Sequence, residues 1–168
     1  LDLNNTKYNE ACDNGAKLEF SDVSEHWAKE YINVLYSAGY INGVGANAFN
    51  PQNDVTRAEF VKMITSQLRL TSNLYKQLFR DVSKDDWFAE CIQTAYEIGI
   101  IPQVMTKDGN FYPNRKITRA EAAAISVMAA GIKNGLKDSS STKIFTDDEI
   151  IPDWACNYVN KAWENKII

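Results

Sequence analysis

Two identical Thr-Arg-Ala-Glu motifs, at residues 56–59 and 118–121, hold the side chains of this chain best suited to bind a charged group. The Thr can cap a helix and the Glu three residues later can bind back to the cap, so the Arg becomes the first helical residue. The helix dipole disfavours a cation there by about 0.3–1 kcal/mol. Arg57 and Arg119 thus break a local preference, and a guanidinium beside unpaired helix N–H groups could bind a carboxylate or a phosphate.

A structural explanation competes with this ligand hypothesis. Each Arg could pair with a nearby acid, for example Asp22 or Asp81, and tie two parts of the chain together. Both acids recur just ahead of a predicted helix, as does Asp147, where a carboxylate can also cap backbone N–H groups. On residue chemistry alone, pairing and capping are favoured over ligand contact.

Aromatic and glycine residues could line the same ligand site. The tryptophans lie on the same face of the predicted helices as the apolar residues that follow them: Trp27, Trp87 and Trp154. Core packing is therefore favoured over stacking of an exposed indole edge on a sugar ring. Gly43 and Gly45 lie in a predicted loop and could let a ligand approach the backbone. A turn that requires a positive φ explains these glycines equally well.

Catalytic and metal-binding patterns are not recognisable. His26, the one histidine, is expected at the surface, and no Ser-His-Asp set can be built around it. The three cysteines have spacings that fit neither a zinc site nor a redox pair. We expect Cys91 to be buried and reduced, whereas Cys12 and Cys156 could form a disulfide in an oxidising exterior. The sequence predicts a protein that is not an enzyme and needs no cofactor or metal.

Composition limits the class of protein and its partners. With 168 residues, 45% hydrophobic and 24% charged, the chain is expected to be globular, with a core that needs no metal or disulfide. The net charge of −4 and the lack of a long Lys/Arg run argue against nucleic acid as a partner. The apolar runs are well short of the ~20 residues that a membrane span needs.

The elements that must position these side chains follow from an internal repeat of about 60 residues. A Phe-x-Asp opening followed by a Trp occurs at residues 20–27, 79–87 and 145–154. After each Trp, apolar residues recur at i+4, i+5, i+8 and i+9, the spacing of an amphipathic helix. Gly39 and Gly99 end the first two helices, and a loop with a Phe-x-Pro sequence leads to each T-R-A-E helix. The sequence predicts a mainly all-α fold of helix–loop–helix units, with at most a short strand pair in the loops.

These motifs resemble the S-layer homology family, whose units combine an F-x-D-V opening, a Trp-bearing helix, a loop with F-x-P and a T-R-A-E helix start. The resemblance covers nearly the whole chain from Phe20 onward. It implies units at residues 20–78 and 79–144, a truncated unit at 145–168, and at 1–19 the tail of a preceding unit with a linker. The third copy departs from the pattern, because it has no T-R-A-E helix and carries Lys166 where the others have Gly.

The resemblance also implies an architecture and a function. Units of this family surround a pseudo-three-fold axis, with the first helices in a central bundle. The implied function is a non-catalytic module outside the cell that anchors an S-layer or other surface protein to a bacterial wall. Its ligand would be an acidic, often pyruvylated, secondary cell-wall polysaccharide bound in grooves. The alternative is a helical protein–protein interaction array that binds no glycan.

For individual residues, the resemblance shifts the preference for the two arginines to ligand contact. The expected ligand-binding residues are then Arg57, Arg119, Asp22, Asp81, Trp27, Trp87, Gly43 and Gly45. We also expect the truncated third copy to bury its apolar face against the other copies or against another chain, so self-association is a further expectation. That face comprises Tyr158, Val159, Ala162 and Trp163.

Overall fold

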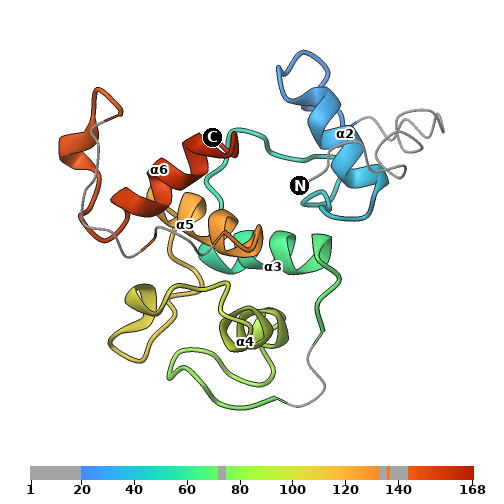
Figure 1. Cartoon of the computed structure of the whole chain (residues 1–168). Helices are drawn as coiled ribbons and strands as arrows, with labels where there is room; N and C mark the ends of the chain where they lie inside the picture. The colour runs from blue at the N-terminus through green and yellow to red at the C-terminus, as the bar shows by residue number, and fades with distance from the viewer. Residues whose placement is uncertain (1–19, 72–74, 133–135, 137–143) are drawn as a thin grey trace. The chain divides into compact units, whose positions relative to one another are not determined.

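The computed structural model describes residues 20–71, 75–132, 136 and 144–168. The chain divides into two compact parts, Leu1–Asp54 and Val55–Ile168, and each is described by itself (Figure 1). The division falls inside the first sequence repeat, between its loop and its T-R-A-E helix. The second helix of the first copy therefore belongs to the same compact part as the second and third copies. The repeat boundaries drawn from the sequence stay a prediction.

In the first part, helix α2 (Lys29–Ser37) packs against the loop that follows it. The ring of Phe20 is buried and lies edge-on to Tyr36, with 5.0 Å between ring centroids, and 5.5 Å from the ring of Phe49. The helix ends at Gly39, whose φ of +74° is the left-handed conformation expected of a helix C-terminus. One aromatic side chain thus holds the helix and the loop of this copy together.

The described residues of the second part form four α-helices and two short 3₁₀ helices. They are α3 (Arg57–Gln67), α4 (Ala89–Glu97), η1 (Gln103–Thr106), α5 (Arg119–Ala129), η2 (Asp148–Ile150) and α6 (Cys156–Glu164). Helix α4 packs against α3, α6 packs against α5, and α3 and α5 also contact each other (Figure 1). The first helix of a copy therefore packs against the second helix of the copy before it.

The predicted mainly all-α fold is confirmed. Over the described ranges, β pairing is limited to two isolated antiparallel bridges, Gly45 with Ala48 and Thr56 with Lys116. The second part has one apolar cluster around α3, α4 and the loop before α5, in which Ile92 and Phe111 are fully buried. A smaller cluster lies between α5 and α6. The pseudo-three-fold bundle stays a prediction.

The third copy buries its apolar face within this chain. Val159 and Ala162 of α6 are buried in the cluster shared with Val127 of α5. Trp163 stays 51% exposed. The face thus rests on the second copy, as expected, and self-association through it stays a prediction.

Both T-R-A-E helices begin with the predicted capping box. The N–H of Glu59 donates to Thr56 Oγ1 at 3.3 Å, and the N–H of Thr56 donates to Glu59 Oε2 at 2.8 Å. The corresponding distances between Glu121 and Thr118 are 3.2 and 3.0 Å. Local sequence therefore gives the two helix starts the same geometry.

The third copy keeps the backbone of the usual helix ending although it lacks the glycine. Lys166 has a φ of +56°, close to the +79° of Gly99 at the matching position. The next residue, Ile167, donates its N–H to the carbonyl of Ala162 at 2.8 Å. In the second copy, Ile100 donates to the carbonyl of Ala95 at the same distance. The ending is thus set by the helix and the packing after it, and Lys166 adopts a conformation that glycine would adopt at lower cost.

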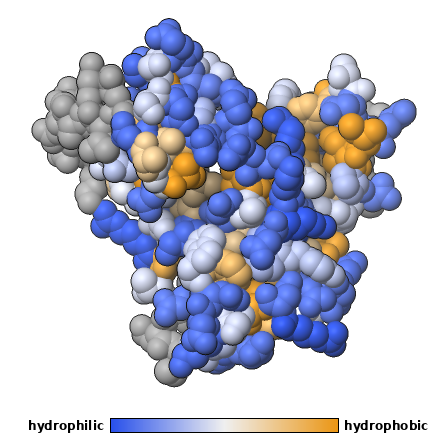
Figure 2. All heavy atoms as spheres, turned by 180° about the vertical axis from the view of Figure 1, so that it is seen from behind, coloured by the Kyte–Doolittle hydropathy of each residue, from blue (hydrophilic) through white to orange (hydrophobic). Residues whose placement is uncertain are grey.

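Seen from behind, the surface is mostly hydrophilic, with hydrophobic side chains in small separate groups (Figure 2). No helix within the described ranges is long and apolar enough to span a membrane.

Candidate functional site

The first candidate arginine, Arg57, is part of the protein core. Its side chain has 0% exposure, and its Nη1 lies 2.6 Å from Oε1 of Glu121. Its Nη2 donates to the carbonyl of Met105 at 3.2 Å, and the guanidinium lies 4.7 Å from the centroid of the Phe111 ring. Burial lowers the pKa of Arg57, and the adjacent Glu121 carboxylate opposes that shift. Arg57 thus joins the T-R-A-E motifs of two copies through a buried ion pair.

The backbone N–H groups at the helix start around Arg57 already have acceptors within the protein. The N–H groups of Arg57 and Ala58 donate to the carbonyls of Arg115 and Pro113 at 2.9 and 3.0 Å. A loop of the second copy therefore satisfies the N–H groups that would otherwise be open to an anion. This geometry does not favour ligand contact at Arg57. It favours the structural explanation, although the acid that pairs with Arg57 is Glu121 and neither of the aspartates suggested by the sequence.

The two repeated aspartates hold their own loops. Each carboxylate accepts hydrogen bonds from two successive backbone N–H groups of the Phe-x-Pro loop of the same copy. The donors are Phe49 and Asn50 for Asp22, at 2.9 and 2.6 Å, and Phe111 and Tyr112 for Asp81, at 2.8 and 2.6 Å. These bonds lower the pKa of Asp22. The carboxylates therefore bind backbone N–H groups, but those of a loop in the same copy, so the predicted capping of the following helix was wrong.

The two tryptophans lie on the surface, so the prediction of core packing for them was wrong. Trp27 is 82% exposed and Trp87 is 62% exposed. Both precede the first residue of their helix, in a turn. In the first copy the ring of Trp27 lies 6.4 Å from that of Tyr31, one turn later, and Tyr31 is also exposed, so this face of α2 is turned to solvent. Phe88 takes the buried position beside Trp87. The indole rings are thus available for stacking, and their contact with a sugar stays a proposal.

Glycine is favoured at the two loop positions for different physical reasons. A Cβ on Gly43 would lie 2.4 Å from Cε1 of Phe20 and 2.7 Å from the carbonyl oxygen of Ala48. Gly43 therefore makes room for the protein's own aromatic core. Gly45 has a φ of +103° and open space around its Cα, as the turn explanation requires.

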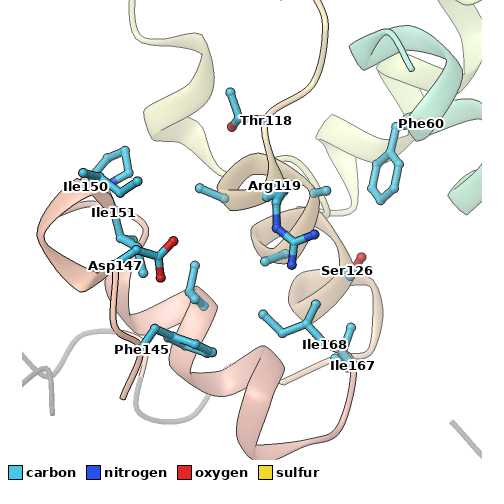
Figure 3. A pocket seen from close by; sticks show the side chains of 15 residues that line it. Phe60, Thr118, Arg119, Ser126, Phe145, Asp147, Ile150, Ile151, Ile167 and Ile168 are labelled. Carbon is cyan, nitrogen blue, oxygen red and sulfur yellow. The ribbon is translucent and has the colours of Figure 1, made fainter. Parts of the chain in front are cut away.

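The second candidate arginine, Arg119, has the opposite surroundings. It is exposed, and its guanidinium points into a pocket of about 620 Å³ (Figure 3). Within the described ranges its side chain makes no hydrogen bond or ion pair. The carboxylate of Asp147 points into the pocket from another wall (Figure 3). The remaining lining is mainly apolar and comes from α3, α5, α6 and the segment around η2: Phe60, Ala122, Ala123, Phe145, Ile150, Ile151, Val159, Ile167 and Ile168.

One further cation was missed by the sequence analysis. Arg115 is 53% exposed, shares the Glu121 carboxylate with Arg57 and lies 5.8 Å from the centroid of the Tyr112 ring. The first copy has Asn53 at the matching loop position, so no repeated motif marks Arg115. In the sequence, only the difference between the two loops, Arg in one and Asn in the other, distinguishes this position.

Cys91 and His26, two other reactive side chains that the structure describes, form hydrogen bonds with the protein backbone. Cys91 is buried as predicted, its thiol donates to the carbonyl of Phe88 at 3.1 Å, and burial raises the pKa of that thiol. Cys12 lies outside the described residues, so its pairing with Cys156 stays a prediction. His26 is only partly exposed, and its Nδ1 accepts the N–H of Ala28 at 3.2 Å. Across the part of the chain that the structure describes, no group of three or more His, Cys, Asp or Glu side chains could hold a metal ion.

Comparison with known proteins identifies the family of the chain. The S-layer homology domain matches residues 19–61 and 78–123. The exoglucanase XynX of Acetivibrio thermocellus is 38% identical over 89% of this chain, and the amylopullulanase of Thermoanaerobacterium thermosulfurigenes is 39% identical over 85%. The surface-layer 125 kDa protein of Lysinibacillus sphaericus is 34% identical over 89% of the chain. The chain spans only 14%, 8% and 12% of the length of these three relatives.

Proposed function

Since the chain belongs to the S-layer homology domain family, we propose that it is a non-catalytic module that anchors a surface protein to the bacterial cell wall. Its ligand is an acidic, often pyruvylated, secondary cell-wall polysaccharide, and it acts outside the cell. The relatives that share this segment carry the names of two different enzymes and a surface-layer protein. A common role in attachment, independent of the rest of each protein, explains why the segment accompanies such different names.

The observation that carries the proposal is the pocket at Arg119. Its guanidinium is free of protein acceptors in the described ranges, and it projects from a helix N-terminus, where backbone N–H groups also favour an anion. A carboxylate of the polysaccharide would bind Arg119 through charge-assisted hydrogen bonds. Because Arg57 is buried and already paired, we assign the anion contact to Arg119.

The rest of the pocket suits a sugar. The apolar walls at Phe60, Phe145 and Ile151 offer contact to the carbon face of a ring, and Asp147 can accept hydrogen bonds from hydroxyl groups. The exposed indoles of Trp27 and Trp87 are further stacking surfaces for a long polymer.

A protein–protein interaction array is the second candidate. The buried pair between Arg57 and Glu121 favours it, because it shows a T-R-A-E motif joining one copy to another without any ligand. In this alternative the chain binds other helical units and no glycan.

The deciding experiment is binding of purified wall polysaccharide, with and without its acidic substituents, to the folded chain. Arg119→Ala removes one charge-assisted contact, so it should weaken binding of the acidic polymer about ten- to a hundredfold. Lys84→Ala, which removes an exposed cation elsewhere, is the matched control and should leave affinity unchanged. Absence of polymer binding would favour the interaction array, and unchanged affinity of a folded Arg119→Ala protein would remove Arg119 from the site.

A further inference from the structure

We propose that Asn42 and Gly43 form a modification site in the loop of the first copy, where Asn42 loses its side-chain amide spontaneously and the backbone becomes an isoaspartyl linkage. Water is the sole co-reactant. The modification is independent of wall binding, because it is a covalent change within the chain. The second copy has no such site, since Pro102 and Gln103 stand at the matching positions.

The chemistry is an attack by the backbone on the side chain that precedes it. The amide nitrogen of Gly43 gives up its proton to solvent and bonds to Cγ of Asn42. The bond from Cγ to the side-chain nitrogen breaks, and that nitrogen takes a proton from solvent and leaves as ammonia. Water then opens the resulting succinimide ring at either carbonyl. The products are aspartate and isoaspartate, and in isoaspartate the backbone runs through the side-chain carbonyl and contains one additional carbon.

The first argument is that both reacting groups are free. Asn42 is exposed and lies outside the helices and bridges. Within the described ranges, neither its side chain nor the N–H of Gly43 takes part in a hydrogen bond. Gly43 also has no side chain that would hinder the approach of its nitrogen to Cγ. Closure of the ring therefore costs no hydrogen bond of the fold.

The second argument is a contrast with the Asp-Gly pair at Asp108 and Gly109 in the loop of the second copy. The Asp108 carboxylate accepts the hydroxyl of Tyr112 and, at 3.2 Å, the N–H of Asn110. These bonds, that from Tyr112 above all, lower the pKa of Asp108, so the group stays ionised and is a poor electrophile. The N–H of Gly109 donates to the carbonyl of Thr106 at 3.1 Å. Both reacting groups are thus held here, whereas both are free in the first copy.

The third argument concerns the effect of the modification on the loop. A Cβ on Gly43 would lie 2.4 Å from Cε1 of Phe20 and 2.7 Å from the carbonyl oxygen of Ala48, so there is no space for a further carbon beside it. The loop is also tightly turned, because Ala46 and Asn47 have φ values of +49° and +57°. Isoaspartate adds a carbon to the backbone directly ahead of Gly43. It should therefore displace Gly43 against Phe20 and loosen the loop.

The first test follows the formation of isoaspartate in the folded chain. Asn14→Gln and Asn134→Gln remove the two other Asn-Gly pairs of the sequence, which lie outside the described residues. The chain is then kept in mildly alkaline buffer, and peptide mass spectrometry with electron-transfer fragmentation distinguishes asparagine, aspartate and isoaspartate at each position.

Asn114 is the matched control in this test. It is exposed like Asn42, but the next residue, Arg115, carries a side chain and its N–H is bound within the loop. Asn42 should react at least tenfold faster than Asn114, and its loss should accelerate as the pH rises, because the attacking nitrogen must lose its proton. Equal rates at the two asparagines would overturn the proposal.

The second test measures the effect on the loop by hydrogen exchange, after chromatographic separation of the isoaspartate form. The N–H groups of Phe49 and Asn50, which Asp22 binds, should exchange at least tenfold faster than in the unmodified chain. The corresponding two N–H groups that Asp81 binds in the second copy should be unchanged. Asn42→Asp introduces the same charge without the additional backbone carbon, so it should leave both pairs unchanged.

The outcomes of the second test decide the effect of the modification. Unchanged exchange in the isoaspartate form would overturn the proposed loosening of the loop. Equal acceleration by Asn42→Asp would assign the effect to charge and would also overturn it. Neither test uses polysaccharide, so both results are independent of the proposed wall binding.

Discussion

The starts of α3 and α5 have the same four residues and the same capping box, yet their arginines lie in opposite surroundings. Arg57 is fully buried against Glu121 and Phe111, whereas Arg119 points into an open pocket. The difference comes from what covers each helix start: a loop of the next copy lies over α3, and no such loop of the described chain lies over α5. The role of a repeated residue is thus set by its neighbour in space as much as by its motif.

The largest expected effect separates the two arginines by stability. Arg57→Ala should cost about 3–5 kcal/mol of unfolding free energy, because it leaves the buried Glu121 with only the half-exposed Arg115 as a counter-charge. Arg119→Ala, which removes an exposed side chain, should change stability by less than about 0.5 kcal/mol. Urea unfolding of the two variants measures both. Equal unfolding midpoints would show that the buried pair contributes no more than the exposed arginine.

The glutamates of the two motifs sharpen the comparison. Glutamine can keep the capping box, so Glu59→Gln should cost little. Glu121→Gln should cost about 2 kcal/mol, because it also removes the charged acceptor of a buried guanidinium. Thermal unfolding of the two single variants and of Glu121→Gln with Arg57→Ala tests the coupling. Additive costs in the double variant would mean that Arg57 and Glu121 do not stabilise each other.

Substitution of the capping threonines should affect the stability of the two helix starts equally. Thr56→Ala and Thr118→Ala should each cost about 1 kcal/mol, because each removes one side-chain acceptor from the same backbone geometry. Matched chemical denaturation curves of the two variants provide the measurement. A large difference between them would show that the box, and not only the arginine, depends on what covers the helix.

The smallest expected effect concerns the helix ending. Lys166→Gly should stabilise the chain by about 0.5–1 kcal/mol, since glycine adopts the observed positive φ without a Cβ clash. Gly99→Ala, at the matching position of the second copy, should destabilise by a similar amount. Melting temperatures of both variants are the readout. Destabilisation by Lys166→Gly would indicate that the lysine side chain makes a contribution larger than the strain.

Several features of the fold could be predicted from sequence because their causes are local. The capping boxes depend on residues three positions apart, and the helix endings at Gly39 and Gly99 depend on a single left-handed residue. The period of the repeat indicated which helices and loops would recur. Burial of Cys91 followed from its place on an apolar stripe that spans one helix.

The candidate site was less predictable because its determinants are far apart in sequence. Arg57 and Glu121 are 64 positions apart, and only packing shows that the arginine of one motif reaches the glutamate of the next. The tryptophans were misplaced because apolar spacing marks one face of a helix but does not show whether another element covers that face; Trp27 and Tyr31 share a face that stays exposed. The pocket at Arg119 arises where α5, α6 and the segment around η2 converge.

The sequence by itself determined the local hydrogen bonds, the helix ends and the mainly all-α character, since these follow from short-range capping and side-chain periodicity. Tertiary structure decided which arginine is buried and paired and which is open to a ligand. The physical reason is that burial and ion pairing depend on surfaces brought together across the repeat. The same motif therefore forms part of the core in one copy and lines an open pocket in the next.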